Sequence, residues 1–280
     1  MALVISGALA LGTAAATASL KYPRIGYTNR CRESICTVST STEETDAEGD
    51  SVTNGLTWDF WQPTAVPGIV AFTFSEAITA DYCGIAGHTL TETGNSVELQ
   101  YWDAGASPAA WVSLGSVVPG SETGNKTIMF LFDSVSSAIW RLIVSGGTTT
   151  TMPVLGAVNI GVALVLERMI YGGHTPITLS KNTTIRPNKS EGGQFLGRSI
   201  IRQGASTTIS LSNLTAAWVR SDFYPFMESS RTYPFFFAWR PTATYADEVA
   251  YCWTNSDIKV SNSGQANLMN TSFSVDAIVE

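Results

Sequence analysis

Short runs of alternating apolar and polar residues recur along the chain between residues 56 and 165. Val70, Phe72 and Phe74 occupy every second position of one such run, which is the pattern of a strand with one buried face. Other runs, such as DYCGIAGH, are continuously apolar and indicate strands covered on both faces. Gly, Pro, Asn and Ser separate the runs, and no amphipathic helix lies between them. The pattern predicts a β-sandwich or jelly roll.

The second half of the chain adds a helical pattern to the strands. The stretch RSIIRQGASTTISLSNL predicts a hairpin that turns at residues 203–205. Apolar residues then recur at three- and four-residue steps, which predicts one short α-helix over about residues 214–231. Thr215 or Asn213 can cap its start, and Pro225 should kink or divide it. The predicted fold class is therefore all-β dominated, with two β-sandwich or jelly-roll domains, the second carrying the helix.

The N-terminal segment lacks both patterns. Residues 1–20 are apolar and rich in alanine, but they contain no basic residue and are interrupted by glycines, so neither a secretory signal nor a membrane span is favoured. We expect this arm to pack on its own chain or on a neighbour. Residues 39–55 hold five acids without the ligand spacing of a calcium loop, which favours a solvated loop or linker. The predicted divisions are residues 1–54, 55–165 and 166–280.

Charge is scarce and unevenly distributed. Charged residues make up 14% of the chain, and the net charge is −7. A net negative charge argues against sequence-independent binding of nucleic acid, which needs a basic face. Residues 1–165 hold 6 Lys or Arg against 14 Asp or Glu, whereas residues 166–280 hold 10 against 9. This asymmetry favours head-to-tail contacts between copies of the chain.

Residues with catalytic or metal-binding chemistry are sparse. The four cysteines show no CxxC spacing and no zinc-type pairing with histidine, so no metal site is predicted. Cys31 and Cys36 are near enough in sequence for a disulfide, but nothing else marks an oxidising compartment, and free thiols are favoured. The chain has no HExxH or Gly-x-Ser-x-Gly motif. We expect no enzymatic activity and no cofactor.

The stretch RPNKSEGGQFLGRSIIRQG, residues 186–204, has the composition of a phosphate-binding loop but not its order. A P-loop places lysine and serine after its glycines and before a helix, whereas here they precede the glycines and a hairpin follows. Arginine forks pair well with carboxylates across subunit interfaces, and the even spacing of Arg198 and Arg202 predicts that they share one strand face. We predict inter-subunit contacts here, with an ordinary solvated face as the alternative. The candidates are Arg186, Lys189, Arg198 and Arg202.

Tryptophans of the first predicted domain suggest a different kind of site. Trp58, Trp61 and Trp102, together with Tyr101 and Trp111, can form a platform on which sugar rings stack. Tryptophan in β-sandwiches is more often packed in the core or at its rim, so packing is the alternative. Glycan contacts at the first three tryptophans therefore stay open as a prediction.

Two families resemble parts of this chain. The order WDFWQP, YCGIAGHTL, SVELQYWDAG, IWRLIV over residues 55–165 resembles a discoidin-type, galactose-binding-like jelly roll. The stretch YGGHTPITLSKNTTIRPNKSEGGQFLGRSIIRQG, followed by PFFFAWRP and EVAYCWT, resembles tail-tip virion proteins of long-tailed bacteriophages, among which the distal tail protein is nearest in function. None of these motifs is a catalytic signature.

The resemblances imply two functions. The tail-tip resemblance implies a virion structural protein, made in the host cytoplasm, that forms a closed ring of identical copies, such as a hexamer, and contacts other tail proteins. The jelly-roll resemblance implies an alternative, a carbohydrate- or receptor-binding virion protein that recognises a host-surface glycan. A secreted glycan-binding accessory protein is a third class, and it would require cleavage near Ser19.

Overall fold

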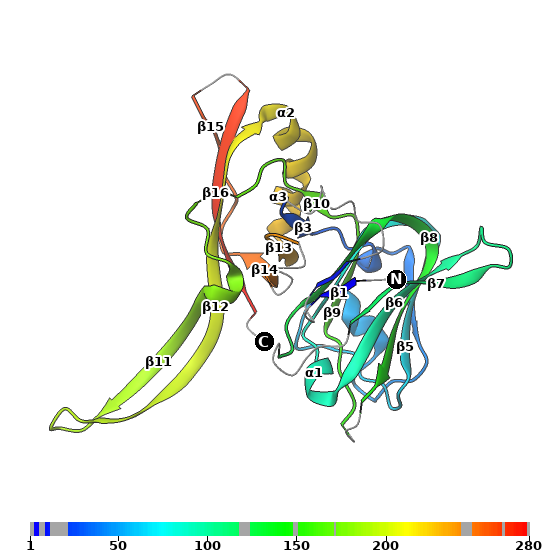
Figure 1. Cartoon of the computed structure of the whole chain (residues 1–280), viewed down its shortest axis with the longest axis horizontal. Coiled ribbons are helices and arrows are strands. Elements are labelled where there is room, and N and C mark those ends of the chain that lie inside the picture. Colours follow the sequence, from blue (N-terminus) through cyan, green and yellow to red (C-terminus); the bar gives the residue numbers. More distant parts are fainter. Residues whose placement is uncertain are drawn as a thin grey trace.

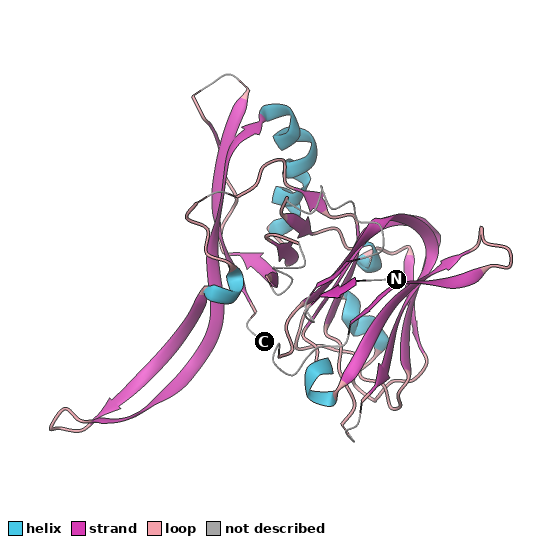
Figure 2. Cartoon of the chain, in the orientation of Figure 1, coloured by secondary structure: helices cyan, strands magenta, loops and turns pink. Residues whose placement is uncertain are grey.

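The computed structural model describes residues 3–5, 9–11, 22–117, 124–147, 151–170, 172–241, 248–264 and 267–278. In this part of the chain the strands form two eight-stranded sheets (Figure 1). One helix of 15 residues lies against the second sheet (Figure 2). The predicted fold class, all-β dominated with one short helix, is confirmed.

Two strands of 19 residues, β5 (Gly68–Ala86) and β8 (Ile128–Gly146), form the centre of the first sheet. They pair antiparallel, and two register shifts between residues 73 and 82 bend them, so that each contributes to both layers of a sandwich. One half is extended by β6 (Asn95–Asp103), β7 (Ala110–Val117) and β4 (Cys36–Thr40). The other half is extended by β9 (Ala157–Gly161), β2 (Leu9–Leu11) and β1 (Leu3–Ile5).

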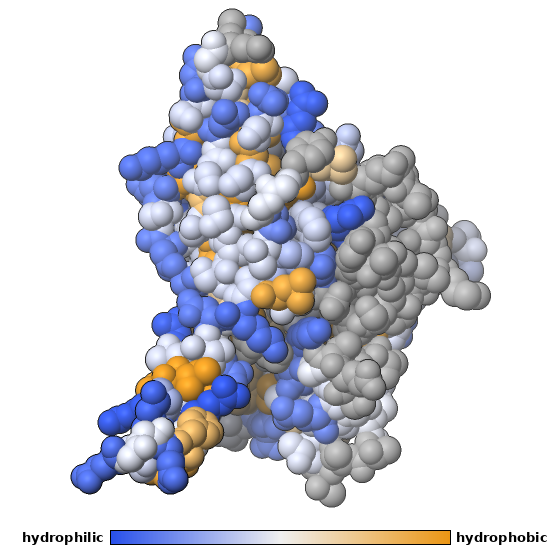
Figure 3. All heavy atoms as spheres, turned by 60° about the vertical axis from the view of Figure 1, so that its left-hand side comes forward, coloured by the Kyte–Doolittle hydropathy of each residue, from blue (hydrophilic) through white to orange (hydrophobic). Residues whose placement is uncertain are grey.

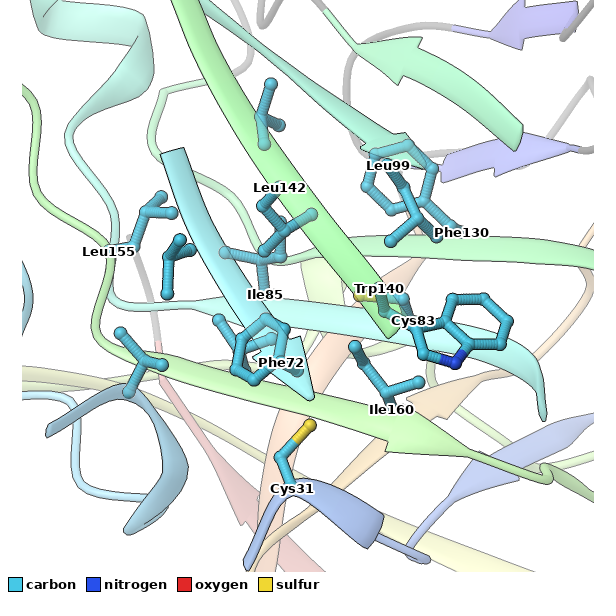
Figure 4. Close-up of a cluster of buried hydrophobic side chains, with 14 of the residues drawn as sticks. Cys31, Phe72, Cys83, Ile85, Leu99, Phe130, Trp140, Leu142, Leu155 and Ile160 are labelled. Carbon is cyan, nitrogen blue, oxygen red and sulfur yellow. The ribbon is translucent and has the colours of Figure 1, made fainter. Parts of the chain in front are cut away.

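The two layers enclose one apolar core (Figure 4). The alternation predicted for residues 70–74 is confirmed, because the apolar side chain at every second position is buried. Burying each large apolar side chain contributes about 1.5–3 kcal/mol, which makes this core the main stabilising feature of the sandwich. Its members include Phe72, Leu99, Trp140 and Leu142 from one layer and Ile85, Phe130 and Ile160 from the other.

The second sheet is built from segments far apart in the sequence. Its strand order is β10 (Leu164–Val165), β3 (Arg24–Gly26), β13 (Phe235–Ala238), β14 (Val249–Thr254), β16 (Leu268–Ala277), β12 (Phe195–Thr215) and β11 (Lys181–Lys189). The short β15 (Val260–Asn262) pairs with β16. Phe235 and Phe237 of β13 join a second apolar core beneath the helix, together with Ile209 and Phe273 of the neighbouring strands.

The predicted helix is confirmed, and it is interrupted as expected. It consists of α2 (Ala216–Trp218), a π turn (Val219–Phe223) and α3 (Tyr224–Ser230). Thr215 caps its start, because the Thr215 Oγ1 accepts a hydrogen bond from the backbone N–H of Trp218 at 3.4 Å. Pro225 lies in the first turn of α3, directly after the π turn. Since proline lacks an N–H, the wider π turn before it accommodates the missing hydrogen bond.

A third apolar cluster joins the sandwich to the second sheet. Tyr82 and Met129 of the sandwich pack with Phe236 and Tyr251 of the second sheet. A Cβ atom at Gly84 would lie 2.6 Å from the Phe236 ring, so the absent side chain permits this close approach. The second sheet is therefore covered by the helix on one face and by the sandwich on the other.

The N-terminal 54 residues are more integrated than expected. β3 pairs with β13 of the second sheet, and β4 pairs with β5 of the sandwich. The acidic segment is not simply a solvated linker, because Ala47 and Val52 are buried, Val52 in the sandwich core. Part of the apolar arm packs on its own chain, where β2 pairs in parallel with residues 129–131 of β8; most of the arm lies outside the described residues. No helix in the described ranges is long and apolar enough to cross a membrane.

Candidate functional site

The β11–β12 hairpin extends beyond the sheet that supports it, at the lower left of Figure 1. Strand β12 pairs with β16 only from Ala205 to Thr215, and residues 195–204 pair with β11 alone. We call the hairpin of residues 181–204 the ribbon. Within the described chain both long edges of the ribbon lack a neighbouring strand. An isolated two-stranded hairpin is marginally stable in water, so this projection needs an explanation.

The ribbon exposes large apolar side chains. Ile185, Phe195, Leu196, Ile200 and Ile201 are between 40% and 67% exposed. They lie together with charged residues in the lower left of the space-filling view (Figure 3). Soluble proteins seldom gather exposed aliphatic and aromatic groups on a protruding strand pair, since such edges promote association.

The same ribbon is basic. Its four predicted contact residues are all exposed, and Lys181 adds a fifth cation, whereas Glu191 is its single acid. In the described part of the chain none of the five cations forms an ion pair. The structure thus brings the predicted residues together on one projecting element. They are Arg186, Lys189, Arg198 and Arg202.

The prediction that Arg198 and Arg202 share one strand face is wrong. Arg202 is paired with Thr184, but Arg198 is paired with Pro187, and the register shifts between these two pairs. Residues paired across an antiparallel ladder point to the same face, and positions 184 and 187 of β11 point to opposite faces. A β-bulge in β12 therefore places the two arginines on opposite faces of the ribbon. Arg186 shares its face with Arg202.

The turn of the hairpin also differs from the prediction. It lies at residues 190–194, where the Ser190 Oγ accepts from the Gln194 N–H at 3.0 Å and Gly193 has a φ of 80°. Only glycine adopts such a conformation without strain, which explains its presence at the tip. At the predicted turn, residues 203–205, β12 continues as an extended strand.

Of the predicted glycan contacts, Trp61 is a core residue. It is fully buried in the sandwich, and its indole N–H donates to the Thr42 carbonyl at 3.1 Å. It therefore has no surface to offer a ligand. The backbone of Trp61 is also paired with Leu155, which holds the loop against the sandwich.

The other two predicted tryptophans are far apart. Trp58 is 75% exposed, on a loop that packs beside Gly87 at one end of β5. The Trp102 carbonyl accepts from the Ser137 Oγ near the bend, where Ser137 is paired with Ile78. The part of β5 from position 78 to its end at position 86 spans about 26 Å. The structure therefore does not unite the three tryptophans in one platform.

A smaller aromatic group surrounds Trp102 on the solvent side of β6 and β7. Its ring meets that of Trp111 edge to face, with centroids 5.4 Å apart. Arg141 of β8 stacks 3.7 Å over Trp111 and donates from Nε and Nη2 to the Gln100 Oε1, at 2.8 and 2.6 Å. We call Gln100, Trp102, Trp111 and Arg141 the aromatic platform. Sequence reasoning missed Gln100 and Arg141, because their place beside the tryptophans depends on the register of three strands.

Neither histidine belongs to a catalytic arrangement. His88 is buried with its Nε2 2.8 Å from the Lys126 carbonyl oxygen, and burial lowers its pKa to about 4. His174 is half-buried with its Nδ1 3.2 Å from the Thr208 carbonyl oxygen, and burial lowers its pKa as well. Among the described residues no group of three or more His, Cys, Asp or Glu is placed to hold a metal ion. The four cysteines are free thiols.

Comparison with known proteins gives similarity of fold over part of the chain. No protein-family model matches the chain, and no curated protein matches it. Among solved structures, a pectin-binding carbohydrate-binding module is 14% identical, with a TM-score of 0.38 over 44% of this chain and 88% of that one. A family 32 carbohydrate-binding module from C. perfringens NanJ, in complex with galactose, is 15% identical, with a TM-score of 0.38 over 48% of this chain and 97% of that one.

An enzyme is also among the similar structures. A GH29 fucosidase from Ruminococcus gnavus is 11% identical, with a TM-score of 0.40 over 50% of this chain, and the match spans 27% of the enzyme's length. At such identities and TM-scores, these similarities assign neither a family nor a ligand to this chain.

Proposed function

We propose that this chain is a structural protein of a bacteriophage tail that assembles with identical copies through its ribbon. The observation that carries the proposal is the projecting strand pair, with its exposed apolar side chains and unpaired cations. The resemblance of residues 171–204 to tail-tip proteins supports the virion as its location, and other tail proteins as further partners. The role requires no catalytic step.

Physical chemistry favours assembly over an isolated ribbon. Removing one large apolar side chain from water contributes about 1.5–3 kcal/mol, so an interface that covers Phe195 and Leu196 gains several kcal/mol from these two alone. A ribbon that docks on a different surface of the next copy makes a head-to-tail contact, and such contacts close into rings when the rotation between copies permits. A hexamer is one closed form.

The test is the solution mass of the protein by light scattering. We expect a discrete multiple of the 29.9 kDa chain for the wild type and a monomer for Phe195→Ser/Leu196→Ser at the same concentration. The loss of about 3 kcal/mol or more corresponds to an association at least ~100-fold weaker. Tyr224→Ser is the matched control, because it removes an exposed aromatic group from the helix rather than from the ribbon. A wild type that stays monomeric at its highest soluble concentration would reject the proposal.

A second candidate function is carbohydrate binding by the sandwich, and the aromatic platform is the observation that favours it. Its tryptophans present aromatic surface, and Gln100 and Arg141 present hydrogen-bonding groups beside them, a combination suited to a sugar ring and its hydroxyls. We expect Trp111→Ala to abolish any binding on a glycan array, whereas Trp58→Ala, at the other end of the sandwich, should retain it. Binding that survives Trp111→Ala, or an array without signal, would remove this candidate.

A further inference from the structure

Trp58 lies in a second apolar spot on the surface, at the end of the sandwich away from its bend. It is the most exposed large apolar side chain in the described chain, and Leu56 beside it is 43% exposed. The loop that carries both is held in place, because the backbone N–H of Leu56 donates to the Asn54 Oδ1 and the backbone of Gln62 pairs with that of residues 44 and 47. An exposed tryptophan on a fixed loop is the kind of group that anchors protein interfaces.

Four exposed acids lie on the segment that pairs with the loop of this apolar spot. We call Leu56 and Trp58, with the neighbouring exposed acids, the Trp58 patch. The backbone of the acidic segment runs beside the loop, because the Glu44 N–H donates to the Gln62 carbonyl and the Gln62 N–H donates to the Ala47 carbonyl. Within the described residues these acids form no ion pair. They are Glu44, Asp46, Glu48 and Asp50.

The ribbon and the Trp58 patch are complementary in both charge and hydropathy. The ribbon combines five cations and one acid with protruding apolar groups, and the patch combines four exposed acids with Trp58 and Leu56. Arginine pairs with carboxylates through two parallel hydrogen bonds, which adds orientation to the attraction. Two ribbons or two patches would repel each other, so charge selects the contact between unlike surfaces.

The ribbon of one molecule does not meet its own patch. In Figure 1 the β11–β12 hairpin points away from the sandwich, which carries the patch. A second copy of the chain supplies the missing surface, and in doing so it leaves its own ribbon free for the next copy. This is the geometry of a ring or a filament.

We infer that the ribbon of one copy docks on the Trp58 patch of the next copy, with Phe195 and Leu196 against Trp58 and the arginines against the acids. The inference rests on the proposed function and specifies it: the partner is the same chain, and the receptor surface is residues 44–50 and 56–58.

A charge-swap experiment on the full chain tests this pairing. Glu44→Lys/Asp46→Lys/Glu48→Lys makes the patch basic, and Arg186→Glu/Arg198→Glu/Arg202→Glu makes the ribbon acidic. We expect each variant alone to be monomeric at concentrations where the wild type assembles, with association at least tenfold weaker. Mixing the two variants should restore the wild-type mass, because each interface then joins unlike charges. Glu76→Lys/Glu92→Lys/Asp133→Lys is the control, since all three acids are exposed on the same sandwich outside the patch.

The outcomes separate this inference from the proposed function. If the ribbon variant is monomeric but the patch variant assembles like the control, the ribbon mediates assembly and the Trp58 patch is not its receptor. If the control disperses as readily as the patch variant, general charge rather than this patch governs assembly, and the inference fails. A wild type that never assembles overturns both. Circular dichroism and thermal unfolding of each variant establish that a smaller assembly does not result from loss of the folded structure.

Discussion

The two parts of strand β12 have the same backbone conformation and opposite surroundings. In residues 205–215 side chains at alternate positions are buried, with Ile209 and Leu211 in the second core, and β16 supplies a neighbouring strand. In residues 195–204 no side chain is buried, and none of the described strands lies on the side away from β11. One continuous strand therefore passes from a completed sheet into an open ribbon.

The difference is not one of apolar content. The open part carries Phe195, Leu196, Ile200 and Ile201 within seven residues, which is as apolar as the buried part. A strand that extends into water would ordinarily replace such residues by polar ones, because exposed apolar edges lead to association. The open part therefore has the apolar content of a partly buried strand without the neighbouring strand, and this is the basis of the proposed assembly.

The largest contrast is expected between Ile209→Ala and Ile200→Ala, the same change in the two parts of β12. Ile209 is fully buried, so its truncation leaves a cavity and should lower the free energy of unfolding by about 2–5 kcal/mol. Ile200 is half exposed, and its truncation should change the stability of the monomer by no more than about 0.5 kcal/mol. Urea unfolding of dilute, monomeric protein measures both. Equal losses would show that the ribbon already packs on its own chain.

The next effect is a pH dependence of stability that originates in the sandwich, at His88. Burial holds the pKa of His88 at about 4, whereas an unfolded histidine titrates near pH 6.5. As the pH falls from about 6.5 to about 4, the unfolded chain gains a proton that the folded chain does not, so stability decreases by up to about 3 kcal/mol. The free energy of unfolding, measured at several pH values across this range, should depend less on pH in His88→Gln than in the wild type. The same slope in that variant would assign the pH dependence to other groups.

The spacing of apolar residues made the strand at residues 70–74 and the helix predictable from sequence. The spacing of apolar residues located the helix. Residue type offered Thr215 or Asn213 as its cap, of which Thr215 is the one used, and Pro225 marked its division. These features depend on neighbours within a few residues. The four basic contact candidates do lie on one projecting element. The local pattern placed only Arg198 and Arg202 on a hairpin, and it put the turn at residues 203–205 instead of 190–194.

Features that depend on distant partners escaped sequence reasoning. The turn expected at Gly204 lies instead at residues 190–194, because glycine also occurs in extended strands and only the pairing with β11 and β16 shows that β12 continues. The separation of Arg198 and Arg202 follows from a bulge, which exists only relative to a partner strand. Likewise, Trp61 is buried by core residues that come both before and after it in the sequence, and these contacts form only when the two layers of the sandwich pack together.

A smaller effect compares glycine-to-alanine changes at two sites, Gly84 in the cluster between the two sheets and Gly204 in the ribbon. At Gly84 an added methyl group would meet the Phe236 ring at 2.6 Å inside a packed cluster, so Gly84→Ala should cost about 1–3 kcal/mol. At Gly204 the nearest atom to an added methyl is the Asn182 carbonyl oxygen at 3.7 Å, so Gly204→Ala should be neutral or stabilise by about 0.4–1 kcal/mol. Thermal unfolding measures both variants. A tolerated Gly84→Ala would mean that the two sheets can move apart.

The smallest effect concerns Thr215, the residue at which the buried part of β12 ends and the helix begins. Its Oγ1 accepts the N–H of Trp218, and Thr215→Ala removes this cap at a cost of about 1 kcal/mol. Thr215→Ser retains the oxygen and should recover most of the loss. The Thr215 backbone N–H still donates to the Glu167 Oε2 at 2.7 Å in both variants, so the strand end itself stays anchored. Because the cap lies far along β12 from the ribbon, neither variant should change the mass of the assembly. A change in the mass of the assembly would show that a change at the buried end of β12 affects the ribbon, so that the two parts of the strand are structurally coupled.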